Sequence, residues 1–202
     1  MQSFQTLSSQ VLPLNIKDID TDMIIPAQFL TQTGEGGYGE HVFQRLRLDK
    51  NFPMNNQKYT GAQIIVAQDN FGCGSSREHA VWALLQYGIQ VVIAPSFSDI
   101  FYSNSGKNGL VLITLEDQLI QSFIDTAEKN EEYILSIDLE EQTVITQEKN
   151  THSFDFDPFR KECILKGHND LEYLTDHMSE INQWQKNREE NLYYSTLQQN
   201  NS

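Results

Sequence analysis

Residues 64–94 read IIVAQDNFGCGSSREHAVWALLQYGIQVVIA and contain a complete succession of strand, loop, helix and strand. The β-branched runs Ile64–Ala67 and Ile89–Ala94 are typical of short strands that are buried on both faces. Between them, a glycine-rich turn leads into an apolar pattern of helical period over Arg77–Tyr87, which Gly88 ends. A helix that connects two buried strands is the unit of a parallel sheet. The stretch therefore indicates an α/β fold.

The remainder of the chain continues the alternation of short apolar strands and helical patterns. Elements are predicted at 11–30 (strand, loop and short helix), 98–104 (helix), 110–114 (strand), 116–129 (amphipathic helix), 133–147 (hairpin) and 157–167 (helix). This order predicts an α/β layer fold whose sheet is mostly parallel. Residues 1–185 are expected to form one domain, whereas the polar residues 186–202 are expected to form a disordered tail outside it.

The composition excludes several classes of function. The 202 residues include 14 Lys and Arg against 28 Asp and Glu, which gives a net charge of −14 at pH 7. A chain this acidic is repelled by nucleic-acid phosphates and by anionic membranes, so we expect it to bind neither. It also lacks an apolar run of the roughly 18 residues that a transmembrane helix needs.

The two cysteines, Cys73 and Cys163, restrict the chemistry that the chain can perform alone. Two thiols are too few for a disulfide framework and fit a reducing, cytoplasmic location. They are also too few to hold an iron–sulfur cluster, which takes several thiolates. The histidines are scattered without metal-ligand spacing, so we predict no metal site in this chain.

The side chains best suited to catalysis or ligand binding lie in the segment Asp69–Ala83, DNFGCGSSREHAVWA. Two glycines let the backbone turn tightly at the end of a strand, and two serines and Arg77 follow at the start of a helix. The free N–H groups and the dipole of a helix N-terminus favour an anion, and the planar guanidinium of Arg77 suits a carboxylate. The segment therefore predicts an anion-binding strand, loop and helix.

Other interpretations of this segment compete with that one. In the simplest, Ser75 or Ser76 is only the N-cap of the helix and Cys73 is a small core residue. A P-loop in its usual form is excluded because no Lys follows the glycines, and the G-x-S-x-G pattern of a nucleophile elbow is absent. A hydrolase with Cys73 as its nucleophile and His79 as its base stays open, as does a non-catalytic anion-binding module.

The nonapeptide GCGSSREHA at residues 72–80 strongly resembles the signature of the small subunits of aconitase-type hydro-lyases, in particular those of 3-isopropylmalate dehydratase (isopropylmalate isomerase). Three further segments agree with that family in order: NIKDIDTDMIIP at 15–26, APSFSDIFYSNSGKNG at 94–109 and DPFRKECILKG at 157–167. The four separate motifs occur in the same order and register as in the family, which chance similarity does not explain. The resemblance spans roughly residues 10–175.

The resemblance implies a fold, an activity and a partner. The small subunits of this family are the swivelling β/β/α domain of the aconitase C-terminal type, which closes on a large subunit. The enzymes isomerise 2-isopropylmalate and 3-isopropylmalate, in leucine biosynthesis, by dehydration to 2-isopropylmaleate and rehydration. Their [4Fe–4S] cluster sits in the large subunit. This chain is therefore expected to bind no cofactor itself and to act on a small dicarboxylate only within that complex.

The motif register assigns roles to individual residues by the same resemblance. Ser75 would be the base that removes a C–H proton, because a helix N-terminus and an adjacent arginine can stabilise its alkoxide. Ser76 and Arg77 would bind a substrate carboxylate. Asp22, in the DTD motif, would join the hydrogen-bond network around the base; without the resemblance it is a turn or cap residue in an acidic loop.

One departure from the family bears on the substrate. Where its bacterial members usually carry an arginine that recognises a substrate carboxylate, this chain has Glu35, and residues 28–44 contain no Lys or Arg. An acidic side chain there repels a carboxylate unless another cation compensates, and Arg45 or Arg47 could supply that cation. The alternative function is therefore that of a paralogous small subunit, in a dehydratase for another malate-type 2-hydroxy dicarboxylate.

The remaining conspicuous side chains are expected to be structural. The aromatic residues Phe97, Phe101 and Tyr102 are predicted to pack in the core, as is Cys163 in the helix that follows the Asp-Pro pair. His79 is predicted to support the glycine-rich loop or the contact with the large subunit, and we assign it no catalytic role.

Overall fold

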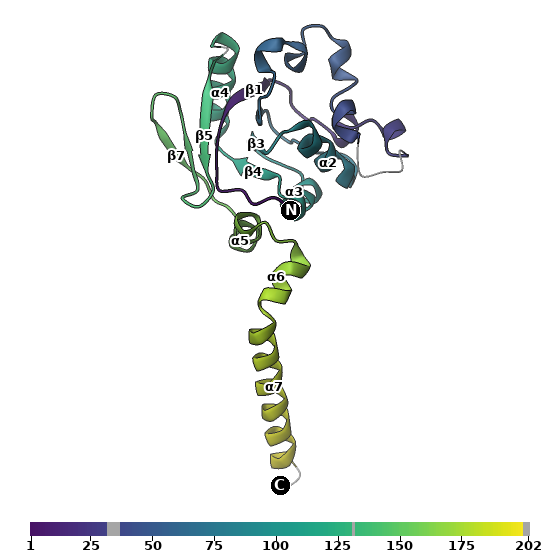
Figure 1. Cartoon of the computed structure of the whole chain (residues 1–202), viewed down its shortest axis with the longest axis vertical. Helices are drawn as coiled ribbons and strands as arrows, with labels where there is room; N and C mark the ends of the chain where they lie inside the picture. The colour runs from purple at the N-terminus through teal and green to yellow at the C-terminus, as the bar shows by residue number, and fades with distance from the viewer. Residues whose placement is uncertain (32–36, 131, 200–202) are drawn as a thin grey trace.

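One seven-stranded sheet crosses the molecule in the order β4-β3-β2-β1-β5-β6-β7 (Figure 1). The computed structural model describes residues 1–31, 37–130 and 132–199 of the chain. Its strands are β1 (Thr6–Leu14), β2 (Ile64–Ala67), β3 (Val91–Ala94), β4 (Val111–Thr114), β5 (Ile134–Asp138), β6 (Thr143–Ile145) and β7 (Thr151–Ser153). Its α-helices are α1 (Thr21–Ile24), α2 (Glu78–Tyr87), α3 (Asp99–Asn108), α4 (Asp117–Lys129), α5 (Pro158–Lys166), α6 (Asp170–Asp176) and α7 (Met178–Gln199).

The strand β1 joins two halves of the sheet that differ in strand direction. Its residues 11–14 pair in parallel with β2, and β3 and β4 continue the sheet in parallel. Its residues 6–10 pair antiparallel with β5, and β6 and β7 continue the sheet antiparallel. We call β1–β4 the parallel half and β5–β7 the antiparallel half. The predicted α/β fold with a parallel sheet is confirmed, and the predicted hairpin extends that sheet.

Alternate residues of the parallel half pack on opposite faces of the sheet, as the two-residue period of a strand requires. Ile65, Val92 and Leu112 belong to the core cluster that includes residues of α2 and α3 on one face. Ile64 and Val91 belong to the cluster that includes residues of α4 on the other face. Because both faces are covered, β2 and β3 are apolar throughout, and burying each of their Val and Ile side chains contributes about 1.5–3 kcal/mol.

The helix ends follow from capping residues. The Ser98 hydroxyl accepts from the Phe101 N–H at 3.3 Å and begins α3, and the Asp157 carboxylate accepts from the Arg160 N–H at 2.8 Å and begins α5. Gly88 ends α2 with a φ of 111°, in the left-handed region.

The side chains predicted to be structural lie in or against the core, as expected. Phe101 and Cys163 are buried, and Phe97 and Tyr102 are partly buried against the same core cluster as Phe101. Phe101 also forms an edge contact with the ring of Phe71, which follows the end of β2. The helix α3 is therefore packed against the loop after β2, and this contact becomes important for the site described next.

The C-terminal region differs from the prediction in its local structure. Residues 186–199, expected to belong to a disordered tail, lie in the helix α7. The chain has no Gly or Pro after Gly167 and is rich there in Gln, Glu and Leu, which favours a helix. The helix extends away from the sheet (Figure 1), and its residues 178–188 are all exposed. A domain boundary at residue 185 stays a prediction. Neither α7 nor any other described helix is long and apolar enough to cross a membrane.

Candidate active site

Two loops meet at the carboxyl edge of the parallel half, the edge at which ligands bind in open α/β sheets. They follow β1 and β2, which are parallel neighbours, so both loops leave the sheet on the same side. The N–H of Gly72 donates to the Ile19 carbonyl at 2.7 Å, and the N–H of Thr21 donates to the Cys73 carbonyl at 2.9 Å. These bonds hold the DTD motif beside the glycine-rich loop, although the two are far apart in sequence.

The glycines of the second loop are required by its geometry. Gly72 and Gly74 have φ values of 76° and 89°, in the left-handed region that glycine adopts at little cost. A Cβ on Gly72 would lie 2.2 Å from Cγ of the buried Phe101 ring, so no side chain fits there. The Ser98 hydroxyl also donates to the Gly72 carbonyl at 2.6 Å. The loop is therefore tied to α3, and it presents the next residues in a defined position.

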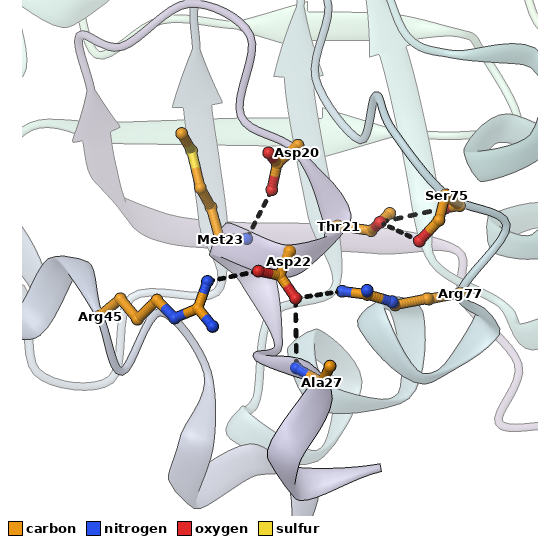
Figure 2. Close-up of polar contacts among 8 residues, drawn as sticks. All are labelled: Asp20, Thr21, Asp22, Met23, Ala27, Arg45, Ser75 and Arg77. Carbon is orange, nitrogen blue, oxygen red and sulfur yellow. Dashed lines mark hydrogen bonds and ion pairs between the residues drawn. The ribbon is translucent and has the colours of Figure 1, made fainter.

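Ser75 lies exposed at the end of this turn and contacts Thr21 of the DTD motif (Figure 2). The Thr21 hydroxyl donates to the Ser75 carbonyl at 3.0 Å, and the two hydroxyl oxygens are 3.2 Å apart. Because a threonine hydroxyl has a single proton, it accepts from Ser75 Oγ while it donates to the carbonyl. Thr21 is buried, so this contact anchors an exposed serine to the core. Thr21 is a site residue that the sequence does not reveal, beyond its place in the DTD motif.

Asp22 lies between two arginines beside this serine (Figure 2). Its Oδ1 accepts from Arg77 Nη1 at 2.5 Å and from the Ala27 N–H at 3.2 Å. Its Oδ2 accepts from Arg45 Nη1. The hydrogen bond from Arg77 is the main cause that lowers the pKa of Asp22 below its usual value, so the carboxylate stays charged. The structure thus places Asp22 and Arg77 in direct contact; their roles in catalysis stay predictions.

The N-terminus of α2 lies open beside Ser76 and Arg77. Arg77 is the N-cap residue, and no described side chain caps the helix. The interpretation that Ser75 or Ser76 is the N-cap is therefore wrong, because the chain turns so that both serines precede the cap. Ser76 is exposed and Arg77 is half-buried. Uncapped N–H groups and a guanidinium leave a positive end at which an anion fits.

Three other predicted residues have different surroundings. The His79 ring packs against Tyr38 and Trp82, with ring centroids 5.3 and 4.7 Å apart. Neither residue belongs to the glycine-rich loop, so the supporting role of His79 stays a prediction. Burial and then nearby carboxylates raise the pKa of the Cys73 thiol, which disfavours the thiolate that a cysteine nucleophile needs. Glu35 lies in the segment 32–36, outside the described residues.

Comparison with known proteins gives a consistent result. A family model described as Aconitase C-terminal domain matches residues 1–118, and a model described as LeuD_N matches residues 123–158. A 3-isopropylmalate dehydratase small subunit from Francisella tularensis subsp. novicida is 51% identical over 189 residues, which cover 93% of this chain and 99% of the relative. The corresponding subunit from Acidobacterium capsulatum is 45% identical, over 92% of this chain and 90% of the relative.

A solved structure agrees with these relatives. The crystal structure of a 3-isopropylmalate dehydratase from Methanocaldococcus jannaschii has a TM-score of 0.64 and 31% sequence identity to this chain. The similarity covers 90% of this chain and 99% of that one. It therefore extends over the whole of the archaeal chain, with both halves of the sheet included, and not only over the segment around the nonapeptide.

Proposed function

Because the chain belongs to the family of 3-isopropylmalate dehydratase small subunits, we propose that it interconverts 2-isopropylmalate and 3-isopropylmalate together with an iron–sulfur large subunit. The reaction removes water to give 2-isopropylmaleate and adds it back with the hydroxyl on the neighbouring carbon. We place this reaction in leucine biosynthesis and in the cytoplasm. The observation that carries the proposal is the cluster of Ser75, Thr21, Asp22 and Arg77 in a chain that is 51% identical to a named small subunit.

Dehydration of a malate removes a weakly acidic proton from one carbon and hydroxide from its neighbour, and a double bond forms between them. We assign the proton to Oγ of Ser75, and rehydration returns it. A serine hydroxyl acts as a base only as its alkoxide, so the surroundings must stabilise a negative oxygen. The positive N-terminus of α2 and the guanidinium of Arg77, two residues along the chain, both favour that charge.

Thr21 can stabilise the same alkoxide by a direct hydrogen bond. Its hydroxyl proton points to the Ser75 carbonyl, and its oxygen is 3.2 Å from Ser75 Oγ. When Ser75 gives up its proton, the Thr21 hydroxyl can rotate toward the alkoxide, since both acceptors belong to the same residue. A charged acceptor strengthens this hydrogen bond, so the rotation favours the ionised serine.

We assign the binding of one substrate carboxylate to Ser76 and Arg77. The Ser76 hydroxyl and the free N–H groups of α2 can donate to it, and the Arg77 guanidinium can bind it through the donors that Asp22 does not use. Asp22 then acts by orienting Arg77, which the short contact between Oδ1 and Nη1 supports. The two serines would thus have separate tasks, proton transfer for Ser75 and substrate binding for Ser76.

The exposure of Ser75 and Ser76 supports a site that a second chain completes. Elimination is favoured where water is excluded, and an exposed loop alone does not exclude it. We assign the cover to the large subunit, whose [4Fe–4S] cluster supplies Lewis-acid chemistry to the departing hydroxyl when it is bound. Among the described residues, no group of three or more His, Cys, Asp and Glu is arranged to hold a metal ion. The steps assigned to this chain use its hydroxyl, carboxylate and guanidinium groups together with the N–H groups of α2.

Anaerobic reconstitution with the iron–sulfur large subunit tests the proposal. Ultraviolet absorbance of the unsaturated diacid follows turnover of 2- and 3-isopropylmalate, with citrate, citramalate and malate offered beside them. We expect both isopropylmalates to react only when both chains are present. Turnover of a different malate alone would show a paralogous dehydratase. No turnover by a well-formed complex would contradict the hydro-lyase and favour an anion-binding module.

A further inference from the structure

The cluster around Asp22 contains one cation more than a single carboxylate needs. Arg45 and Arg77 approach this carboxylate from opposite sides (Figure 2), so two guanidinium groups share one carboxylate. These three side chains therefore keep a net charge of about +1, in a chain whose net charge is −14. The nearest acidic neighbour in the DTD motif, Asp20, is occupied as the N-cap of α1, where it accepts from the Met23 N–H at 2.7 Å.

The two arginines differ in how freely they can leave Asp22. The Arg45 side chain is 57% exposed, whereas that of Arg77 is 24% exposed. If Arg45 moved away, Asp22 would keep its bonds from Arg77 and from the Ala27 N–H. The Arg45 contact is therefore the one that an incoming anion can replace without leaving the carboxylate unpaired.

The backbone near Arg45 is fixed to the helix that carries Asp22. The N–H of Phe43 donates to the Ile24 carbonyl at 2.8 Å, and the Phe43 ring is fully buried. Phe43 has a φ of 52°, in the left-handed region, which costs a residue with a large side chain about 1–3 kcal/mol. Surrounding contacts maintain this strain, and strained backbone of this kind concentrates at functional sites. The chain is thus held in a conformation that brings Arg45 to the edge of the site.

From this geometry we propose that Arg45 is a second substrate-binding residue. Arg77 binds one carboxylate of a 2-hydroxy dicarboxylate, and Arg45 binds the other. The inference rests on the proposed function. A dicarboxylate brings two negative charges to an acidic chain, and one guanidinium for each carboxylate matches them. Arg45 exchanges its bond to Asp22 for a bond to the substrate, so one charge-assisted hydrogen bond replaces another.

Kinetics of the reconstituted complex test this assignment. In Arg45→Ala we expect the KM for 3-isopropylmalate to rise about 10- to 100-fold, the effect of losing one charge-assisted hydrogen bond, with kcat little changed. Arg45→Lys keeps the charge but not the planar fork, so its KM should lie between those of the wild type and Arg45→Ala. Lys50→Ala is the matched control, since it removes an exposed cation from the same segment, and its KM should equal that of the wild type.

Inhibition by a 2-hydroxy monocarboxylate distinguishes two roles for Arg45, binding of the second substrate carboxylate and positioning of the other site residues. The inhibition constant of this compound should be the same in the wild type and in Arg45→Ala, because the compound lacks the carboxylate that Arg45 binds. If Arg45→Ala lowered kcat without raising KM, or changed neither, the inference would be wrong. Failure of the wild-type complex to turn over any malate would instead contradict the proposed function. Calorimetric titration of the complex with malate would then test Arg45 alone: weaker binding by Arg45→Ala supports the inference, and equal binding overturns it.

Discussion

The parallel half and the antiparallel half of the sheet share the strand β1 but differ in what they can build. In the parallel half, successive strands end at the same edge, so the loops after β1 and β2 bring Asp22 and Ser75 to one place. In the antiparallel half, each strand reverses the chain, and successive loops lie at opposite edges. All residues that we assign to the site follow β1 or β2. The direction of the strands thus determines where a site can form in this molecule.

The helices that cover the two halves show a second difference. The helices α2 and α3 pack on the parallel half, and α2 presents to the site an N-terminus that none of the described side chains caps. Beyond the antiparallel half, the chain continues through α5 and α6 into α7, whose residues 178–188 are all exposed. Substitutions at the carboxyl edge of the parallel half should therefore affect both folding and turnover, whereas changes in α7 should leave the core intact.

The largest effect is expected from Gly72→Ala in the parallel half. The new Cβ would overlap the buried Phe101 ring, and the φ of 76° at this position is unfavourable for alanine. We therefore expect the free energy of unfolding to fall by about 3 kcal/mol, and turnover to be lost because the loop shifts. Gly61→Ala is the matched control, since Gly61 has a φ of 85° but no atom within 4 Å of its Cβ, and it should lose about 1 kcal/mol. Chemical denaturation measures both; equal losses would contradict the close contact.

A smaller effect is expected from Asp22→Asn, which keeps the shape of the side chain but removes its charge. Arg77 would lose the carboxylate that orients it, and we expect kcat/KM to fall about 100-fold, as for a misplaced binding group. Steady-state turnover of the reconstituted complex measures this change. A value close to that of the wild type would show that Asp22 is only a turn residue and that its carboxylate has no role in the site.

The difference in stability between the wild type and Asp22→Asn should depend on pH. The hydrogen bond from Arg77 holds the pKa of Asp22 in the folded state below its usual value. The ion pairs of Asp22 therefore contribute fully above about pH 5 and are lost as the pH falls through the folded-state pKa. The carboxylate is a third exposed, so the wild type should exceed Asp22→Asn by only about 1 kcal/mol near neutral pH. That difference should shrink in acid; a difference that grows there would contradict the assignment.

The smallest effect is expected from truncation after His177, which removes α7. Because residues 178–188 are exposed, the free energy of unfolding should fall by less than about 1 kcal/mol, and Tm by less than about 4 °C. Ile164→Ala in α5 is the contrast, since Ile164 is fully buried and its loss should cost about 2–5 kcal/mol. A truncation as harmful as Ile164→Ala would show that α7 supports the core.

Local sequence pattern was sufficient for the elements of the parallel half. The β-branched run of β2, the glycines and the apolar period of α2 are contiguous, so their order could be predicted without tertiary information. Ser75, Ser76 and Arg77 were found for the same reason. Asp22 needed the family resemblance, because its contact with Arg77 depends on the pairing of β1 with β2, which no local signal determines.

The rest of the site depends on tertiary contacts that the sequence does not state. Thr21 becomes part of it through the N–H that it donates to Cys73, and Arg45 reaches Asp22 through a strained backbone at Phe43. The position of the N-cap at Arg77 follows from how the loop turns, and the competing interpretation of Ser75 or Ser76 as the N-cap was wrong. In α7 a polar composition suggested disorder, although its residues have good helix propensity.

Turnover by the complex of Ser75→Ala tests most directly the claim that the loop after β2 carries the base. We predict a fall of about 10² to 10⁴ in kcat, with the complex still formed on size-exclusion chromatography. Ser136→Ala is the matched control in the antiparallel half, where the Ser136 hydroxyl lies 2.7 Å from that of Ser8, and it should keep wild-type turnover. Near wild-type turnover by Ser75→Ala would contradict the account.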